Sequence, residues 1–200
     1  MSRTDPTIVT VLRHGAVEGR AHIFRGVLND PLSVQGATQM QRALARCHVA
    51  DFDAVATSPL KRCHEFAATY ATQHHLPLRV LPQFGELAFG DWEGLTPAEV
   101  AARNPEEYQT FSATHGVHAP PNGESLAQLR ARISLGWHEW LASDDGTNRL
   151  LITHAGVMRA LLMELFGFTP AQAFQIALPE AACLRISWLH GQPPFLLYIN

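Results

Sequence analysis

The chain has few cysteines and no long apolar run. Its 200 residues include three cysteines, Cys47, Cys63 and Cys183, and no Cys-x-x-Cys pair. This odd number and this spacing indicate neither a disulfide framework nor a zinc knuckle, and they fit a reducing compartment. No segment approaches the roughly 20 apolar residues of a membrane helix, and the N-terminal apolar run is too short for a signal peptide. We therefore expect a soluble, cytoplasmic protein with no membrane partner.

The chain also lacks an excess of positive charge. Its 15 Lys and Arg residues against 18 Asp and Glu residues give a formal net charge of −3. This charge does not attract nucleic acids to the surface, so we expect no nucleic-acid partner. A hydrophobic fraction of 46% over 200 residues provides a sizeable core without a disulfide or a metal. No repeat or linker is evident, which predicts one domain over residues 1–200. The 11 histidines are numerous and raise the question of metal binding or acid–base chemistry.

Short apolar runs rich in β-branched residues alternate with segments of helical period, which predicts an α/β fold. The predicted strands are residues 7–12, 53–57, 78–81 and 149–153, followed by a terminal hairpin of 183–189 and 195–199. The predicted helices are residues 33–46, 59–74, 125–141 and 156–166. Ser58 is expected to cap the second helix, with Pro59 at its first position. Ser125 and Gln128 form a plausible capping box for the third.

Residues 82–122 have no clear period and are rich in Gly, Pro and aromatic residues. Within them, only a short helix at residues 97–103 is predicted. An irregular connection of roughly 40 residues is too long for an ordinary loop, so we expect a functional lid or binding segment. Its aromatic side chains, together with Phe24, either line an apolar wall for the organic part of a substrate or pack the lid. These aromatic residues are Phe89, Trp92, Tyr108 and Phe111.

Cationic and titratable side chains follow three of the predicted strands. The sequence Arg13-His14-Gly15 comes after the first strand, residues 58–62 after the second, and His154-Ala155-Gly156 after the strand at 149–153. In an open parallel sheet, ligands bind outside the carboxyl ends of the strands. We therefore expect Arg13, His14, Arg62 and His154 to share one site.

Two arginines and two histidines in one site would repel one another when charged. Each pair of unit charges costs roughly 4 kcal/mol at about 4 Å and an effective dielectric constant near 20, so the cluster indicates a bound anion. A phosphate fits best, because arginine forks match its oxygens and helix N-termini add N–H donors. A carboxylate or sulfate would satisfy the same charges less fully. Taken singly, each junction fits a surface arginine or a structural histidine better than a ligand site, but three matching junctions disfavour that interpretation.

Four motifs in these segments resemble those of the histidine phosphatase superfamily, also called the phosphoglycerate mutase-like family. They are LRHG at 12–15, SPLKRC at 58–63, ELAFGDWEG at 86–94 and THAGVMRAL at 153–161. The motifs occur in the family's order and span most of the chain. One such motif is a weak signal, whereas the four together are specific. The resemblance implies a three-layer α/β sandwich, in which helices flank a mostly parallel mixed sheet, and it implies no metal and no cofactor.

The resemblance also implies a role for each matched residue. His14 would be the nucleophile that forms a phosphohistidine. Arg13 and Arg62 would hold the phosphoryl oxygens, and His154 would help to stabilise the transferring group. Glu86 would act as the acid and the base, a function that typically contributes about 10²–10⁴-fold to the rate.

The first motif departs from the family pattern. Many relatives continue with Arg-His-Gly-Glu-Thr-x-x-Asn, but this chain has Ala16, Val17 and Arg20 at the corresponding positions. The usual phosphate contact from Asn is therefore missing. Arg20 or Arg25 is expected to replace it, and Gly26 joins them as a candidate substrate-binding residue.

Other polar side chains near the motifs are weaker candidates for catalytic, substrate-binding or metal-ligating roles. Asp91 and Glu93 lie in the same motif as Glu86 and are alternative candidates for the acid–base role. Glu124 either complements the dipole of the helix that follows or contacts substrate. His115 and His118 have a ligand-like interval but no third ligand nearby in sequence, so we expect no metal site.

Residues 24–40 and the Pro-x-Gly-Glu-Ser at 121–125 resemble the phosphatase members, including the α-ribazole phosphatases. The mutase branch has Arg-His-Tyr-Gly near the acid, where this chain has FGDWEG at 89–94. The expected function is a metal-independent phosphomonoesterase that acts through phosphohistidine on a small phosphate ester, with α-ribazole 5′-phosphate as one candidate. The alternatives are mutase-type phosphoryl transfer and a non-catalytic protein that binds a phospho-ligand. The oligomeric state stays open, a homodimer included.

Overall fold

Six strands form one mixed sheet at the centre of the structure, a computed structural model that describes residues 5–47 and 51–199. The strands are β1 (Thr7–Arg13), β2 (Ala54–Thr57), β3 (Leu78–Val80), β4 (Asn148–Thr153), β5 (Cys183–Trp188) and β6 (Phe195–Ile199). Their order is β3-β2-β4-β1-β5-β6, in which the first four are parallel and β5 and β6 are antiparallel to their neighbours. The predicted mostly parallel mixed sheet and its terminal hairpin are thus confirmed.

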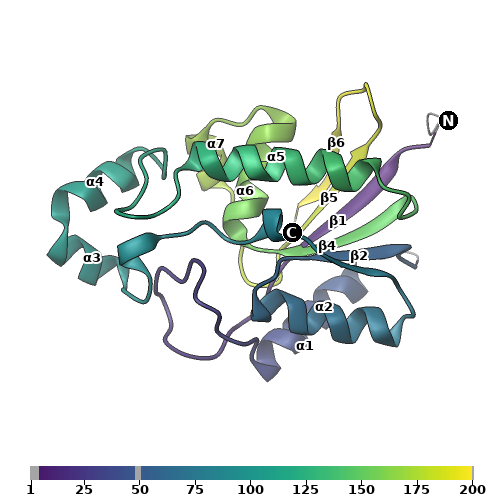
Figure 1. The fold of residues 1–200 in the computed structure, drawn as a ribbon, viewed down its shortest axis with the longest axis horizontal. Helices are drawn as coiled ribbons and strands as arrows, with labels where there is room; N and C mark the ends of the chain where they lie inside the picture. Colours follow the sequence, from purple (N-terminus) through teal and green to yellow (C-terminus); the bar gives the residue numbers. More distant parts are fainter. Residues whose placement is uncertain (1–4, 48–50, 200) are drawn as a thin grey trace.

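Helices cover both faces of the sheet, giving the three layers visible in Figure 1. One layer consists of α1 (Val34–Arg46) and α2 (Lys61–Gln73), and the other of α5 (Leu126–Ala142), α6 (Ala155–Phe166) and α7 (Pro170–Gln175). Each layer packs on its own apolar cluster against the sheet. Because helices bury both faces, β1, β2 and β4 read in the sequence as continuous apolar runs. The six-residue α7 was not predicted.

The start of α2 differs from the prediction. The helix begins at Lys61, after Leu60 in an extended conformation, and Ser58 is not its N-cap. The hydroxyl oxygen of Ser58 accepts a hydrogen bond from Leu60 N over 3.2 Å and lies 2.7 Å from His154 Nε2. The serine therefore belongs to the strand end and its neighbours rather than to the helix. The capping box of Ser125 is present as predicted.

Residues 82–122 contain more helix than predicted. Two 3₁₀ turns, η1 (Pro82–Phe84) and η2 (Gly90–Trp92), are followed by the predicted α3 (Pro97–Arg103) and by an unpredicted α4 (Pro105–Ala113). No residue of α4 is buried, so its sequence carries no clear apolar face. Both α3 and α4 stand apart from the sheet in Figure 1. Among the described residues, no helix has the length and apolar character needed to cross a membrane.

Candidate active site

The carboxyl ends of β1, β4 and β2 lie side by side and bring the predicted side chains together. His14 N donates to Thr153 O over 2.9 Å, and Ser58 N donates to Ile152 O over 3.0 Å. A cavity of about 350 Å³ opens at this edge of the sheet. Six predicted site residues line it, and two do not. The six are Arg13, His14, Arg25, Gly26, Arg62 and Glu86; the two are Arg20 and His154. A second cavity, of about 690 Å³ between α1 and α2, contains none of them.

His14 is held as a neutral ring with one nitrogen free. Its side chain is buried, and Nδ1 lies 2.8 Å from Gly15 O, which assigns the proton to Nδ1. That tautomer leaves the lone pair of Nε2 available as a nucleophile. Burial, followed by the charges of Arg62, Arg13 and Arg25, lowers the pKa of His14 to about 3, although the bond to Gly15 opposes the shift. Desolvation contributes more to this shift than the arginines do.

Arg62 is buried and Arg13 is half-buried beside His14, and backbone carbonyls anchor both side chains. Arg13 Nη1 donates to Leu178 O over 2.5 Å, and Arg62 donates to Leu28 O and Gly26 O over 2.6 and 2.7 Å. The Nε atoms of both arginines are buried and have no hydrogen-bond partner among the described residues. Leaving a buried charged donor unpaired is costly. The oxygens of an anion in the cavity would supply acceptors.

His154 lies behind His14 rather than in the cavity wall. The two rings meet edge to face, with centroids 5.2 Å apart and an interplanar angle of 64°. His154 is fully buried, and desolvation together with the nearby cations lowers its pKa well below the ordinary value. Its Nε2 lies 2.7 Å from Ser58 Oγ. The geometry therefore supports a neutral His154 that fixes the His14 ring, with Ser58 as a partner that sequence reasoning missed.

Glu86 lies at the N-terminus of α6, where backbone N–H groups face its carboxylate. Leu87 N donates to Oε1 over 3.0 Å, and Gly156 N approaches Oε2 at 3.4 Å. A methyl group on Gly156 would displace the carboxylate of Glu86, because it would collide with Oε1. Arg132 fixes the backbone of this segment, because its guanidinium donates to Glu86 O over 3.0 Å.

The comparisons with known proteins agree with this geometry. The model of the histidine phosphatase superfamily (branch 1) matches residues 9–200. This chain belongs to the histidine phosphatase superfamily. The protein is accordingly a phosphatase with the α/β sandwich of that family, as the sequence motifs predicted.

Named relatives of this histidine phosphatase differ in substrate. It is 27% identical over 164 residues to the adenosylcobalamin/alpha-ribazole phosphatase of Escherichia coli (strain K12), covering 82% of this chain and 80% of that protein. It is 27% identical over 208 aligned positions to the 2,3-bisphosphoglycerate-dependent phosphoglycerate mutase of Pseudoalteromonas atlantica, covering 88% of this chain and 91% of that protein. A solved mycobacterial glucosyl-3-phosphoglycerate phosphatase superposes with a TM-score of 0.82 at 25% identity, covering 98% and 99% of the two chains.

The two arginines offered as replacements for the family's Asn have different positions in this histidine phosphatase. Arg20 donates to Glu99 over 2.8 Å and to Gly94 O over 3.1 Å, and it lies outside the cavity lining. Arg25 lines the cavity and pairs with Asp30. Of the two, only Arg25 stays a candidate. Gly26 also lines the cavity.

The competing carboxylates have structural partners. Glu93 Oε1 accepts from Phe89 N over 3.1 Å, and Asp91 Oδ2 accepts from Asn122 Nδ2 over 3.0 Å. Glu124 pairs with Arg132 at 2.6 Å. None of these three carboxylates lines the cavity. Of the four carboxylates considered, Glu86 is therefore the one placed to exchange a proton with a substrate there.

The described part of the histidine phosphatase holds no cluster of metal-ligating side chains. Within residues 5–47 and 51–199, no group of three or more His, Cys, Asp or Glu side chains is placed to hold a metal ion. The ring of His115 packs on Phe174 with centroids 5.7 Å apart, and His118 Nδ1 lies 3.4 Å from Thr114 Oγ1. These two histidines therefore have local structural contacts.

Proposed function

We propose that this histidine phosphatase is a metal-independent phosphomonoesterase that passes the phosphoryl group of a small phosphate ester first to His14 and then to water. The observation that carries the proposal is the protonation and the position of the His14 ring. Its ring is neutral, it lines a cavity together with three arginines, and the engagement of Nδ1 by Gly15 O leaves the lone pair of Nε2 available. Such a nitrogen is a nucleophile at neutral pH, and the arginines supply the charge that a metal provides in other phosphatases.

In the first step, the lone pair of His14 Nε2 forms a bond to phosphorus while the bond from phosphorus to the ester oxygen breaks. Arg13 and Arg62 bind the equatorial oxygens, whose negative charge spreads in the transition state. Glu86, protonated at the start, gives its proton to the departing alkoxide. The products are an alcohol and phosphohistidine.

In the second step, water attacks the phosphorus of phosphohistidine. Glu86 is now a carboxylate and accepts the proton of that water, while the bond between nitrogen and phosphorus breaks and its electrons return to His14. Inorganic phosphate leaves, and Glu86 is again protonated. His154, which is neutral and in contact with the His14 ring, keeps that ring in one orientation through both steps.

The substrate we propose is a small phosphate monoester such as α-ribazole 5′-phosphate. The Escherichia coli relative carries the name adenosylcobalamin/alpha-ribazole phosphatase, and the motifs of this chain follow the phosphatase pattern rather than the mutase pattern. The relative named as a mutase makes phosphoryl transfer between positions of phosphoglycerate the competing outcome.

The test measures free phosphate with α-ribazole 5′-phosphate and with 3-phosphoglycerate, each with and without EDTA. We expect one phosphate per ester consumed, the same rate with EDTA, and no 2-phosphoglycerate. Formation of 2-phosphoglycerate without phosphate release would instead identify a mutase. Saturable binding of the esters without turnover would identify a binding protein, and inhibition by EDTA would contradict metal independence.

A further inference from the structure

The mouth of the cavity has an apolar wall formed by two aromatic rings. Phe24 and Phe89 both line the cavity, and their ring centroids are 4.8 Å apart. Trp92 is buried behind them, with its ring centroid 5.5 Å from that of Phe24. The sequence alone left open whether these aromatics face a substrate or pack the lid. In the structure, Phe24 and Phe89 line the cavity, and Trp92 packs behind these two rings.

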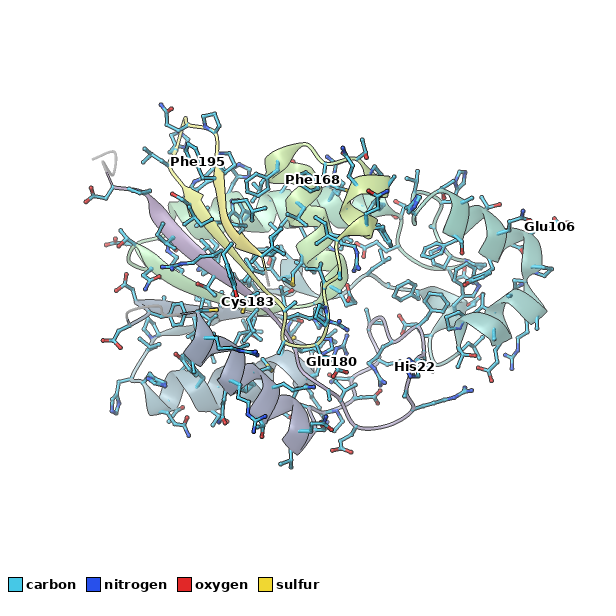
Figure 2. All side chains as sticks on the ribbon, turned by 180° about the vertical axis from the view of Figure 1, so that it is seen from behind. His22, Glu106, Phe168, Glu180, Cys183 and Phe195 are labelled. Atoms are coloured by element: carbon cyan, nitrogen blue, oxygen red, sulfur yellow. The ribbon has the colours of Figure 1, made fainter. Side chains whose placement is uncertain are left out.

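Glu180 supplies a carboxylate at the same mouth. Figure 2 labels it on the loop before β5 and labels His22 on the segment after β1, and both residues line the cavity. Glu180 Oε2 accepts a hydrogen bond from Gln39 Nε2 over 3.0 Å. Gln39 Oε1 in turn accepts from Ala16 N over 2.7 Å. These two bonds hold the carboxylate in a set position relative to the strand end that carries His14.

The cationic side chains of the cavity lining balance the charge of one phosphate group and leave no excess for a second anionic group. Its cations are Arg13, Arg25 and Arg62, and Arg25 already pairs with Asp30. The net charge of these three arginines and Asp30 therefore matches that of one phosphoryl dianion. A second anionic group on the substrate would find no uncommitted arginine in the lining, and it would lie near Glu180.

We propose that Glu180 is a specificity residue that rejects phosphate esters with an anionic leaving group, so that the substrates are esters whose leaving group is uncharged and contains a ring. This inference rests on the proposed phosphatase function. The aromatic wall accommodates a flat apolar group, while Glu180 accepts hydrogen bonds from hydroxyl or N–H groups and repels a carboxylate. A neutral nucleoside monophosphate ester meets both conditions, whereas phosphoglycerate, with its carboxylate, does not.

Two esters that differ only in one charge test the inference: phenyl phosphate and 4-carboxyphenyl phosphate. The measured quantity is the ratio of their kcat/KM values, neutral over anionic. A unit charge near Glu180 at the solvent-exposed mouth changes this ratio by about five- to tenfold at low ionic strength. We expect Glu180→Gln to lower the ratio by that factor and Glu180→Lys to lower it further. The difference between wild type and Glu180→Gln should shrink as salt is added.

Glu18→Gln provides the matched control, because it removes the same charge from an exposed position outside the cavity lining. Its ratio should equal that of the wild type. If Glu180→Gln turns over phenyl phosphate with an unchanged ratio, the specificity role is wrong while the phosphatase function stands. If the wild type hydrolyses neither ester nor any other monoester, the proposed function itself fails.

Discussion

The floor and the mouth of the cavity are built in different ways. The floor consists of His14 and Arg62, with His154 behind His14, and all three are buried at or beside the ends of adjacent strands. The mouth consists of Val17, Gly19, residues 21–26, Phe89 and Glu180, which lie on connections between elements. Backbone pairing of the sheet fixes the floor, whereas ion pairs and single hydrogen bonds hold the mouth. The chemistry therefore depends on the sheet, and the choice of substrate depends on the loops.

The side chains of the floor are buried, whereas many of those near the mouth are exposed, and this difference changes how their charges interact. At the floor, desolvation keeps both histidines neutral, so the arginines next to them are tolerated. Beside the mouth, exposed pairs such as Arg20 with Glu99 are screened by water and add little stability. Substitutions at the floor should consequently abolish turnover, while substitutions at the mouth should change which ester is preferred.

The largest effect is expected from His14→Asn, which removes the nucleophile while keeping a polar side chain of similar size. We expect the rate of phosphate release to fall by about 10⁴-fold or more. The control is His138→Asn on the exposed face of α5, which should change the rate less than about twofold. Wild-type activity in His14→Asn would show that the residues of the floor do not carry out the reaction.

Glu86→Gln removes the group that moves the proton. For an ester with an alkyl alcohol, we expect kcat to fall by about 10²–10⁴-fold. For 4-nitrophenyl phosphate, whose leaving group needs no proton, the loss in the first step should be much smaller. Asp91→Asn, outside the cavity, is the matched control and should leave both rates near those of the wild type. Equal losses of kcat/KM for the two esters in Glu86→Gln would contradict the acid role, because kcat/KM reports the first step and not the hydrolysis of phosphohistidine.

The buried histidines also predict how stability depends on pH. The pKa of His14 is about 3 in the folded state, below its ordinary value of 6.5, so the unfolded chain binds the proton more readily. The free energy of unfolding should therefore fall as the pH drops below about 6.5, by up to about 1.4 kcal/mol per pH unit for this group. Urea unfolding at several pH values should show a shallower fall in His14→Asn. Parallel profiles would indicate that His14 is charged in the folded state.

The smallest effects separate the two arginines of the segment that follows β1, Arg20 and Arg25. Arg20→Ala breaks an exposed ion pair and should change kcat/KM less than about twofold. Arg25→Ala removes a cation of the cavity lining and should raise KM by about tenfold. Steady-state kinetics with phenyl phosphate give both values. The reverse order would mean that Arg20 turns into the cavity when substrate binds.

Much of the sheet and of the floor was predictable, because both rest on local patterns. Apolar runs marked β1, β2 and β4, and the motif residues follow those strands directly. The unpredicted α4 has no buried residue, and α7 is a single short helix, so neither has a periodic apolar face long enough to recognise.

The missed residues act through partners far away in the sequence. Ser58 meets His154 across 96 positions, and Gln39 meets Glu180 across 141. No local spacing encodes such contacts, since they arise only when the sheet places the strand ends together. For the same reason, Ser58 looked like a helix cap in the sequence, and Arg20 looked as close to the phosphate as Arg25 did.

The most direct test of the central claim is to trap the phosphoenzyme. Enzyme mixed with radiolabelled phosphate ester is quenched in base, digested, and mapped by mass spectrometry. We predict one phosphoryl group on the peptide that contains His14, stable in base, released by acid, and absent from His14→Asn. Steady release of phosphate with no acid-labile label on this peptide, or a label on another side chain, would contradict the account.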